Sequence, residues 1–193
     1  MLNLEQHLPK TKMTNVQDEI QVQFIELLQK LIGVSSFSKE EDKAADIIRK
    51  FLKSKKIPFE TKLNNTWAKN KHYNFLKPSI LLNSHIDTVK PVSGWNKDPF
   101  TAAIDENKLY GLGSNDAGAA LISLLATFLH FYEKEDLKYN IIFAATSEEE
   151  ISGKNGIEQI EEITSACEFA IVGEPTEMKM AIAEKGLMVL DGE

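Results

Sequence analysis

Side chains that could bind a metal ion or move a proton follow several apolar runs of this sequence. His85 and Asp87 come just after the run ILLN, and Glu174 comes directly after FAIVG. A third run, IIFAAT, precedes the acidic stretch Ser147 to Glu150. Imidazole and carboxylate groups are common ligands of divalent metals, and a positioned carboxylate can also act as a general base. These residue types therefore indicate metal-assisted or acid–base chemistry.

Taken singly, the His85–Asp87 pair has two interpretations. A His two residues before an Asp at a strand end is compatible with a local hydrogen-bonded turn. Side chains at positions i and i+2 of an extended segment also point the same way. Asp87 could then accept a hydrogen bond from one imidazole nitrogen of His85 while the other nitrogen binds a metal.

Each of the other acidic residues, taken by itself, also has both a structural and a functional interpretation. Asp116 could be a helix N-terminal residue that the helix dipole favours. The run SEEE could be a solvated acidic loop, although adjacent carboxylates raise one another's pKa unless a cation shares them. Glu174 precedes Pro175, which suits a rigid ligand position or a plain turn. Functional and structural interpretations therefore both remain for these residues.

Two further features are assigned no functional role. The stretch GLGSND resembles a phosphate-binding loop but lacks the third Gly, or the Lys followed by Ser or Thr, that such loops use. His7, His72 and His130 lie in polar segments or in a helical pattern, where we expect ordinary structural or exposed positions.

The hydrophobic pattern predicts an α/β domain with a mixed, mostly parallel sheet flanked by helices. We expect helices over Val16 to Ile32, from a Ser38–Glu41 capping box through residue 55, and over residues 116–134. Because ligands of open α/β sheets lie outside the carboxyl ends of the strands, the acidic and imidazole groups are expected at one sheet edge. The expected strands are IPFET, NTWAK, SILLN, a hairpin within FTAAIDENKLYGLG, YNIIFAAT, CEFAIVG, MKMAIAEKG and LMVLDG.

Composition argues against several classes of partner. The 193 residues carry a formal net charge of -7, which disfavours nucleic acid and anionic membranes as partners. The longest apolar run, residues 117–129, is too short to span a bilayer. Cys167 is the only cysteine and the first residues show no secretion signal, so a reducing, cytoplasmic location is expected. Arg49 is the only arginine, which leaves little means of gripping a substrate carboxylate with an arginine fork.

In order and rough spacing, four stretches resemble the acetylornithine deacetylase and succinyl-diaminopimelate desuccinylase family of dinuclear zinc amidohydrolases and exopeptidases. They are SHIDTV, GWNKDPFTAAIDENKLYGLGSNDAGAA, ATSEEEISGKNG and VGEPT. The chain departs from the family at Leu112, where the family often has Arg, and at residues 117–119, where it has Met-Lys-Gly. Neither position is a metal ligand in the family. The resemblance implies a zinc-exopeptidase-like fold.

The resemblance also implies a role for each candidate residue. His85 and Glu174 would bind a first metal, with Asp87 orienting His85. Asp116 would bridge two metals, and Glu150 would bind the second. The implied ions are two Zn²⁺, with Co²⁺ or Mn²⁺ possible for this mixed ligand set.

The general base of the family falls in the run of three glutamates. Aligning Ser147 to Glu150 with the family pattern places the base at Glu149, and a shift by one residue would place it at Glu148. The base would take the proton of the attacking water and pass it to the leaving amine.

Family members are roughly twice as long as this chain. By the resemblance, residues 1–186 form the N-terminal part of the catalytic domain and residues 187–193 begin the connection to a lid domain that also carries the homodimer interface. The last metal ligand of the family, a His, lies beyond that lid. We therefore expect the second metal site to be incomplete in this chain, with one metal bound well and a second poorly.

The implied substrate is a small N-acyl amino acid, most simply N-acetylornithine of arginine biosynthesis. Succinyl-diaminopimelate and dipeptides are alternatives within the same class of reaction. A non-catalytic remnant that keeps the fold and binds metal is an alternative of a different class.

Overall fold

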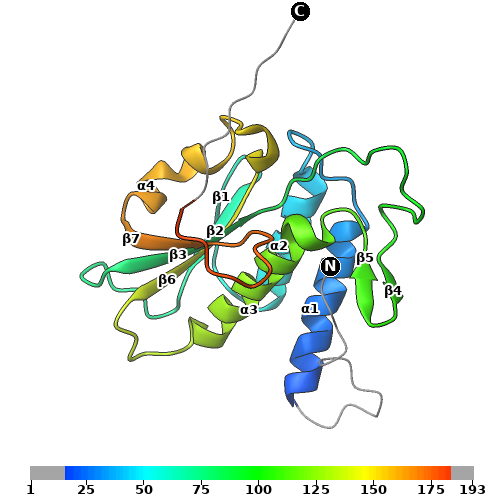
Figure 1. Cartoon of the computed structure of the whole chain (residues 1–193). Helices are drawn as coiled ribbons and strands as arrows, with labels where there is room; N and C mark the ends of the chain where they lie inside the picture. Colours follow the sequence, from blue (N-terminus) through cyan, green and yellow to red (C-terminus); the bar gives the residue numbers. More distant parts are fainter. Residues whose placement is uncertain (1–15, 184–193) are drawn as a thin grey trace, which may run out of the picture.

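A five-stranded sheet forms the centre of the computed structural model, which describes residues 16–183 (Figure 1). The strands lie in the order β1-β2-β6-β3-β7. Strand β3 pairs in parallel with β6 and β7, whereas β2 is antiparallel to both β1 and β6. The predicted mixed sheet is therefore confirmed, with its parallel part in β6-β3-β7. The strand bounds are β1 Glu60–Lys62, β2 Asn65–Lys69, β3 Ser79–His85, β6 Asn140–Thr146 and β7 Cys167–Val172.

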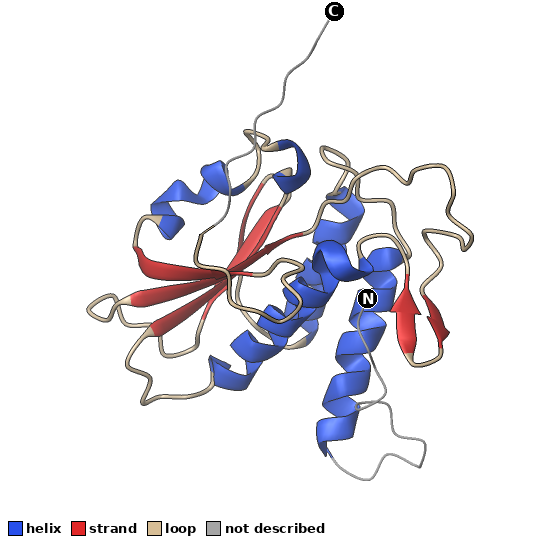
Figure 2. Cartoon of the chain, viewed as in Figure 1, coloured by secondary structure: helices blue, strands red, loops and turns tan. Residues whose placement is uncertain are grey.

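Three long helices lie on one side of the sheet, the second and third packed on it and the first packed against those two (Figure 2). They are α1 Val16–Ile32, α2 Asp42–Ser54 and α3 Ala120–Tyr132. Their buried side chains pack with Leu82, Phe143 and Ala145 of β3 and β6 in one hydrophobic core. The helical spacing of apolar residues in the sequence predicted these three helices because that spacing places one apolar stripe toward the core.

The opposite face of the sheet has a smaller cover. Leu81, Ile142 and Ala144 alternate with the residues of the first face and pack against Ile160. Ile160 ends the short helical turn Ile157–Ile160, which leads into α4 Glu161–Thr164. Both faces of β3 and β6 are thus buried, which explains why their sequences read as continuous apolar runs.

The long helix begins later than the sequence suggested. An irregular helical turn, Ser114–Ala119, precedes α3, and Asp116 and Ala117 within it have non-helical backbone angles. Gly113 stands before the turn with a φ of 74°. Because the regular helix starts only at Ala120, Asp116 lies on an irregular segment that directs it toward the sheet edge. The predicted hairpin just before it is confirmed as β4 Ala103–Asp105 and β5 Lys108–Tyr110.

The predicted capping box at Ser38 and Glu41 is wrong. Helix α2 begins at Asp42 with Glu41 as its N-cap, and no side chain caps it. The Ser38 hydroxyl donates instead to Asp87 Oδ2 at 2.7 Å. A hydrogen bond from the Ser38 hydroxyl to a buried carboxylate is stronger than a helix cap between the hydroxyl and a backbone amide. The tertiary contact therefore prevails over the local one.

The strand predicted over MKMAIAEKG is also wrong in its described part. Residues 178–183 form no strand, and Met178, Met180 and Ile182 are largely exposed. A strand is held by hydrogen bonds to a neighbouring strand, and this segment pairs with none in the described residues. The rest of that run and the run LMVLDG lie outside the described residues. Within residues 16–183 no helix is long and apolar enough to cross a membrane.

Candidate metal centre

His85 ends strand β3 and is almost completely buried, with 2% of its surface exposed. Its Nδ1 atom lies 2.9 Å from the backbone oxygen of Asp87 and 3.4 Å from Asp87 Oδ1. Its Nε2 atom faces the other way, toward the carboxyl edge of the sheet. One ring nitrogen is therefore fixed by Asp87 while the other is presented to the candidate centre, as a metal-ligating histidine requires.

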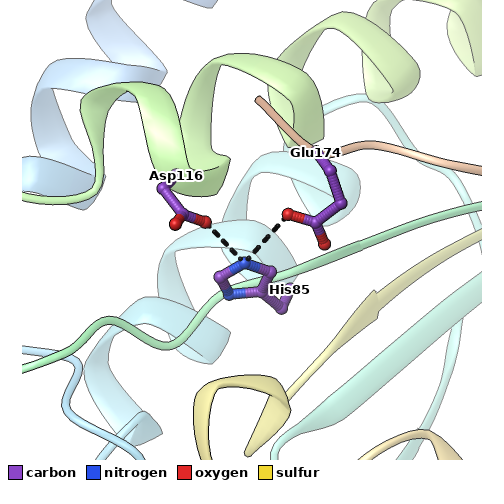
Figure 3. A group of neighbouring side chains, drawn as sticks. All are labelled: His85, Asp116 and Glu174. Atoms are coloured by element: carbon purple, nitrogen blue, oxygen red, sulfur yellow. Dashed lines mark hydrogen bonds and ion pairs between the residues drawn. The ribbon is translucent and has the colours of Figure 1, made fainter. Parts of the chain in front are cut away.

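Two carboxylates from distant segments meet this Nε2 atom (Figure 3). Asp116 Oδ1 lies 3.1 Å from it and Glu174 Oε2 lies 3.7 Å from it. Asp116 comes from the irregular turn before α3, and Glu174 from the segment just after β7. Ligand atoms of the three residues all lie within 4.8 Å of one another. This donor set, one imidazole nitrogen and two carboxylate oxygens around a common point, fits a divalent metal ion.

Asp87 is itself held by four donors. Besides His85 and Ser38, the backbone N–H of Glu149 donates to Oδ1 at 3.0 Å and that of Glu150 donates to Oδ2 at 3.1 Å. Burial alone would raise the pKa of Asp87, but these hydrogen bonds outweigh it and lower the pKa below its usual value. Asp87 is therefore a fixed anion behind His85.

The carboxylates make the centre strongly attractive to positive charge. Burial by itself would lower the pKa of His85, but hydrogen bonds and negative charge from Asp87 and Glu174 raise it to about 11. In the metal-free chain the imidazole is therefore protonated at neutral pH. A divalent metal would take the place of that proton, since a metal-bound imidazole must be neutral.

The glutamates of the acidic run have different environments. Glu149 Oε2 lies 3.8 Å from His85 Nε2, at the rim of the cluster. Burial, together with the charge of Glu174 and other nearby carboxylates, raises the pKa of Glu149. Burial and the charge of Asp116 likewise raise the pKa of Glu150. Glu150 is not a member of the three-residue cluster, although the charge of Asp116 acts on its carboxyl group.

Glu148 is turned away from the cluster and is buried, with 5% of its surface exposed. Its carboxylate accepts hydrogen bonds from the Asn155 side-chain amide at 2.7 Å and from the Asn155 backbone N–H at 3.3 Å. Its backbone has a φ of 54°, in the left-handed region. The adjacent glutamates therefore point to opposite sides of the turn.

The remaining histidines lie outside the centre. His72 Nε2 lies 3.8 Å from Glu135 Oε1, and His130 is exposed and packs edge-on against Phe131. His7 lies outside the described residues. The contacts that the sequence did not predict are those of Ser38 with Asp87 and of Glu41 with the acidic turn, residues 147–150. Their only signal in the sequence was the S-x-x-E spacing.

The sequence decides the family of this chain. Residues 81–185 match the family described as Peptidase family M20/M25/M40. The chain belongs to this family. The M20 family consists of metallo-hydrolases with dinuclear metal centres, and the matched residues include all three members of the His85–Asp116–Glu174 cluster.

Curated M20 relatives carry two different activities in their names. A succinyl-diaminopimelate desuccinylase of Buchnera aphidicola subsp. Cinara cedri is 34% identical over 168 residues, covering 81% of this chain and 43% of that protein. An acetylornithine deacetylase of Erwinia tasmaniensis is 31% identical over 189 residues, covering 92% of this chain and 47% of that protein. The chain thus spans less than half the length of both relatives.

The fold of this chain is similar to the folds of solved M20 structures. An M20 family metallo-carboxypeptidase from Sulfolobus solfataricus superposes with a TM-score of 0.63 at 23% identity, covering 81% of this chain and 37% of that chain. A dinuclear metal-binding M20 peptidase from Bacillus subtilis gives a TM-score of 0.62 at 18% identity, covering 81% of this chain and 43% of that chain. The zinc-exopeptidase-like fold expected from the sequence is therefore confirmed.

Proposed function

We propose that this chain supplies the metal-binding part of the active site of an amide hydrolase that removes the acyl group from an N-acyl amino acid. The observation that carries the proposal is the convergence of Asp116 and Glu174 on the Nε2 atom of buried His85. Asp87 holds the opposite ring nitrogen, so that the imidazole can present only Nε2 to the centre. This is the arrangement expected of a histidine that binds a metal.

The proposed ligands divide between two metal positions. His85 and Glu174 would hold the first ion, Asp116 would bridge both, and Glu150 would contribute to the second. Zn²⁺ is the ion that we propose, with Co²⁺ or Mn²⁺ compatible with the same nitrogen and oxygen donors. When bound, such ions supply Lewis-acid stabilisation of charge on the substrate carbonyl and lower the pKa of water.

Glu149 is proposed as the general base. Its carboxylate lies at the open rim of the cluster, and its raised pKa moves it toward the pH at which proton transfer is efficient. Its carboxylate would hold the proton removed from water and then deliver it to the leaving amine. Glu148 is unsuited to this role because Asn155 occupies its carboxylate in a buried position.

The substrate that we propose is N-acetylornithine, as in arginine biosynthesis. The resemblance to an acetylornithine deacetylase over 92% of this chain supports it. Succinyl-diaminopimelate is the second candidate, favoured by the slightly higher identity to a desuccinylase. A dipeptide is a third candidate of the same reaction class.

Groups outside the described residues are proposed to bind the substrate carboxylate. Arg49, the only arginine of the chain, is already engaged in the structure. Its Nε donates to Thr66 Oγ1 at 3.1 Å and its Nη2 donates to the Leu63 backbone oxygen at 2.7 Å. We accordingly propose that residues 1–186 are the N-terminal part of a catalytic domain. A lid and dimerisation domain, and beyond it the missing metal ligand, would complete the enzyme.

Calorimetric titration of the chain with Zn²⁺ tests the metal centre. We expect one tight equivalent and a second, much weaker one. His85→Ala should weaken the tight equivalent by more than the roughly 10–100-fold typical of losing an indirect partner, because a direct ligand is removed. His130→Ala is the matched control, since His130 is exposed and outside the cluster, and it should bind as the unmodified chain does. Equal binding by both variants would refute the proposed site.

Catalysis is tested on a chimera in which the second half of the Erwinia tasmaniensis deacetylase follows this chain. We expect Zn²⁺-dependent hydrolysis of N-acetylornithine, and loss of turnover with intact metal content in Glu149→Ala. Turnover that survives Glu149→Ala but not Glu148→Ala would transfer the base to Glu148. Metal binding without hydrolysis of any acylated amino acid or dipeptide would favour a non-catalytic metal-binding remnant.

A further inference from the structure

Three consecutive backbone amides of the acidic turn donate to two buried carboxylates. The N–H of Glu148 donates to Glu41 Oε1 at 3.2 Å. The N–H groups of Glu149 and Glu150 donate to the two oxygens of Asp87 at 3.0 and 3.1 Å. Successive N–H groups around a left-handed residue form a concave anion-binding site. Here the acceptors of the three amides are the protein's own side chains, Glu41 and Asp87.

Several hydrogen bonds hold the Glu41 side chain in this position. It is the N-cap residue of α2 and only 1% of its surface is exposed. Its Oε1 atom also accepts the Lys39 N–H at 2.7 Å, and its Oε2 atom accepts the Asn64 side-chain amide at 2.9 Å. Among residues 16–183 no Lys, Arg or His forms an ion pair with Glu41. Neutral donors alone contact this buried carboxyl group, so each of these hydrogen bonds helps to hold its partner in place.

The segment before α2 also contacts Asp87, the residue that binds the turn. Ser38 donates its hydroxyl to Asp87 Oδ2, the oxygen that also accepts the Glu150 N–H. Ser38 and Glu41, which the sequence presents as a helix cap, therefore both support the acidic turn. The link joins residues 107 positions apart in the chain.

From these contacts we infer that Glu41 is a positioning residue of the active site, holding the turn that carries Glu149 and Glu150 against Asp87. The Glu148 amide fixes where the turn begins, and the next two amides fix its direction. With all three amides directed inward, the side chains of Glu149 and Glu150 project outward to the centre. This role rests on the proposed function, because it acts through the proposed base and the proposed second-metal ligand.

The opposite side of the turn explains why the amide contact matters. Glu148 is anchored by Asn155, and Ser147 donates its backbone N–H to the side-chain oxygen of buried Asn65 at 3.1 Å. These contacts fix the residues before Glu149 but touch neither Glu149 nor Glu150. Without the acceptor at position 41, the turn would keep its contacts with Asn65 and Asn155. It would lose the Glu148 N–H hydrogen bond, which sets the backbone direction from Glu148 to Glu149.

A Co²⁺ titration of three variants at two adjacent positions tests this role. Glu41→Leu keeps the volume but removes the acceptor, whereas Glu41→Gln keeps a side-chain oxygen in place of Oε1. Glu40→Leu is the control, because Glu40 is an exposed glutamate one residue earlier. We expect Glu41→Leu to weaken the second Co²⁺ equivalent by about 10–100-fold, the usual cost of losing an indirect partner. The first equivalent should stay unchanged, since His85, Asp116 and Glu174 lie on other segments.

The conservative variant separates positioning from mere packing. Glu41→Gln should restore most of the second-equivalent affinity, and Glu40→Leu should behave like the unmodified chain. Equal affinity of Glu41→Leu and the unmodified chain for the second equivalent would overturn the inference. A loss of the same size in Glu41→Gln and Glu41→Leu would also overturn it, because then the acceptor oxygen would not be the cause.

Amide hydrogen exchange in the unmodified chain gives a test that needs no metal and no variant. We expect the Glu148 amide to exchange as slowly as those of Glu149 and Glu150, because all three donate to buried carboxylates. Fast exchange at Glu148 alone would overturn the inference even where Glu41→Leu fails to fold. If the chain binds no Co²⁺ but protects all three amides, the proposed function fails and the link from Glu41 to the turn still stands.

Discussion

At the scale of single residues, Glu148 and Glu149 show how one backbone turn gives identical side chains different tasks. The left-handed backbone of Glu148 sends its buried carboxylate to Asn155, away from the cluster. Glu149 follows with its amide on Asp87 and its carboxylate at the rim of the cluster. The first glutamate therefore contributes to stability, and the second is available for chemistry.

Exchanging each glutamate for alanine should separate these two tasks. Glu148→Ala removes the acceptor of two Asn155 hydrogen bonds, which should lower the free energy of unfolding by about 0.5–1.5 kcal/mol per lost hydrogen bond, because exposed Asn155 can bind water instead. Glu149→Ala should leave that free energy unchanged or raise it, since burial and the neighbouring carboxylates both disfavour the charge of Glu149. Urea unfolding of both variants measures the difference. A larger loss in Glu149→Ala would contradict the assignment.

At the scale of elements, the centre depends on how closely β7 approaches α3. Gly173 follows directly after β7 and lies against α3 and β3. Its N–H donates to the Asn83 backbone oxygen at 2.8 Å, and its own oxygen accepts the Ser84 hydroxyl at 2.8 Å. A Cβ atom at this position would lie 2.9 Å from both Ala120 Cβ and Leu124 Cδ1. Only glycine lets the two elements come this close, and the next residue is Glu174.

Gly173→Ala should therefore disturb both stability and metal binding. We expect the free energy of unfolding to fall by about 1–3 kcal/mol, the usual cost of overpacking, and the Zn²⁺ affinity to fall because Glu174 shifts with β7. Gly33→Ala is the control, because Gly33 is exposed and its nearest neighbour is a backbone oxygen 3.3 Å away. Unfolding curves and Zn²⁺ calorimetry measure the two effects. Unchanged Zn²⁺ affinity in Gly173→Ala would argue against Glu174 as a ligand.

At the scale of the whole molecule, the cluster couples folding to pH. The pKa of His85 is raised from 6.5 to about 11. Its contribution to stability is therefore complete below pH 6.5 and lost as the pH rises toward 11. Glu149 and Glu150 have pKa values raised above 4.5, so their charge opposes folding at neutral pH and protonation relieves it. Asp87, with its pKa lowered from 3.8, stabilises the fold above that pH and loses this effect in stronger acid.

The metal-free chain should accordingly be most stable in mildly acidic solution. We expect the urea midpoint, measured in the presence of a chelator, to rise as the pH falls from 9 to between about 4 and 6, and to drop below about pH 4 as Asp87 is protonated. His85→Asn should remove most of the alkaline slope. Saturating Zn²⁺ should raise the midpoint at neutral pH, since a ligand of the folded state stabilises it. A midpoint that rises steadily from pH 6 to pH 9 without metal would contradict the charge arrangement.

Much of the fold could be predicted from the sequence because it is encoded in local periodicity. The helices α1 and α2, the hairpin and the strands β3, β6 and β7 follow from the spacing of apolar residues. The strand predicted over residues 178–183 failed because pairing needs a neighbour, and a sequence pattern does not supply one. The start of α3 was placed too early because the irregular turn around Asp116 depends on its packing against other segments.

The sequence by itself determined the residue types of the centre and their meeting at one edge, since strands that run in parallel end on the same side of the sheet. It could not determine which of the three glutamates faces His85. That choice depends on the left-handed backbone at Glu148 and on an acceptor, Glu41, that lies 107 residues earlier. Helix caps and strand alternation reflect neighbours in the chain. Hydrogen bonds between buried groups far apart in sequence form only when the tertiary structure brings them together.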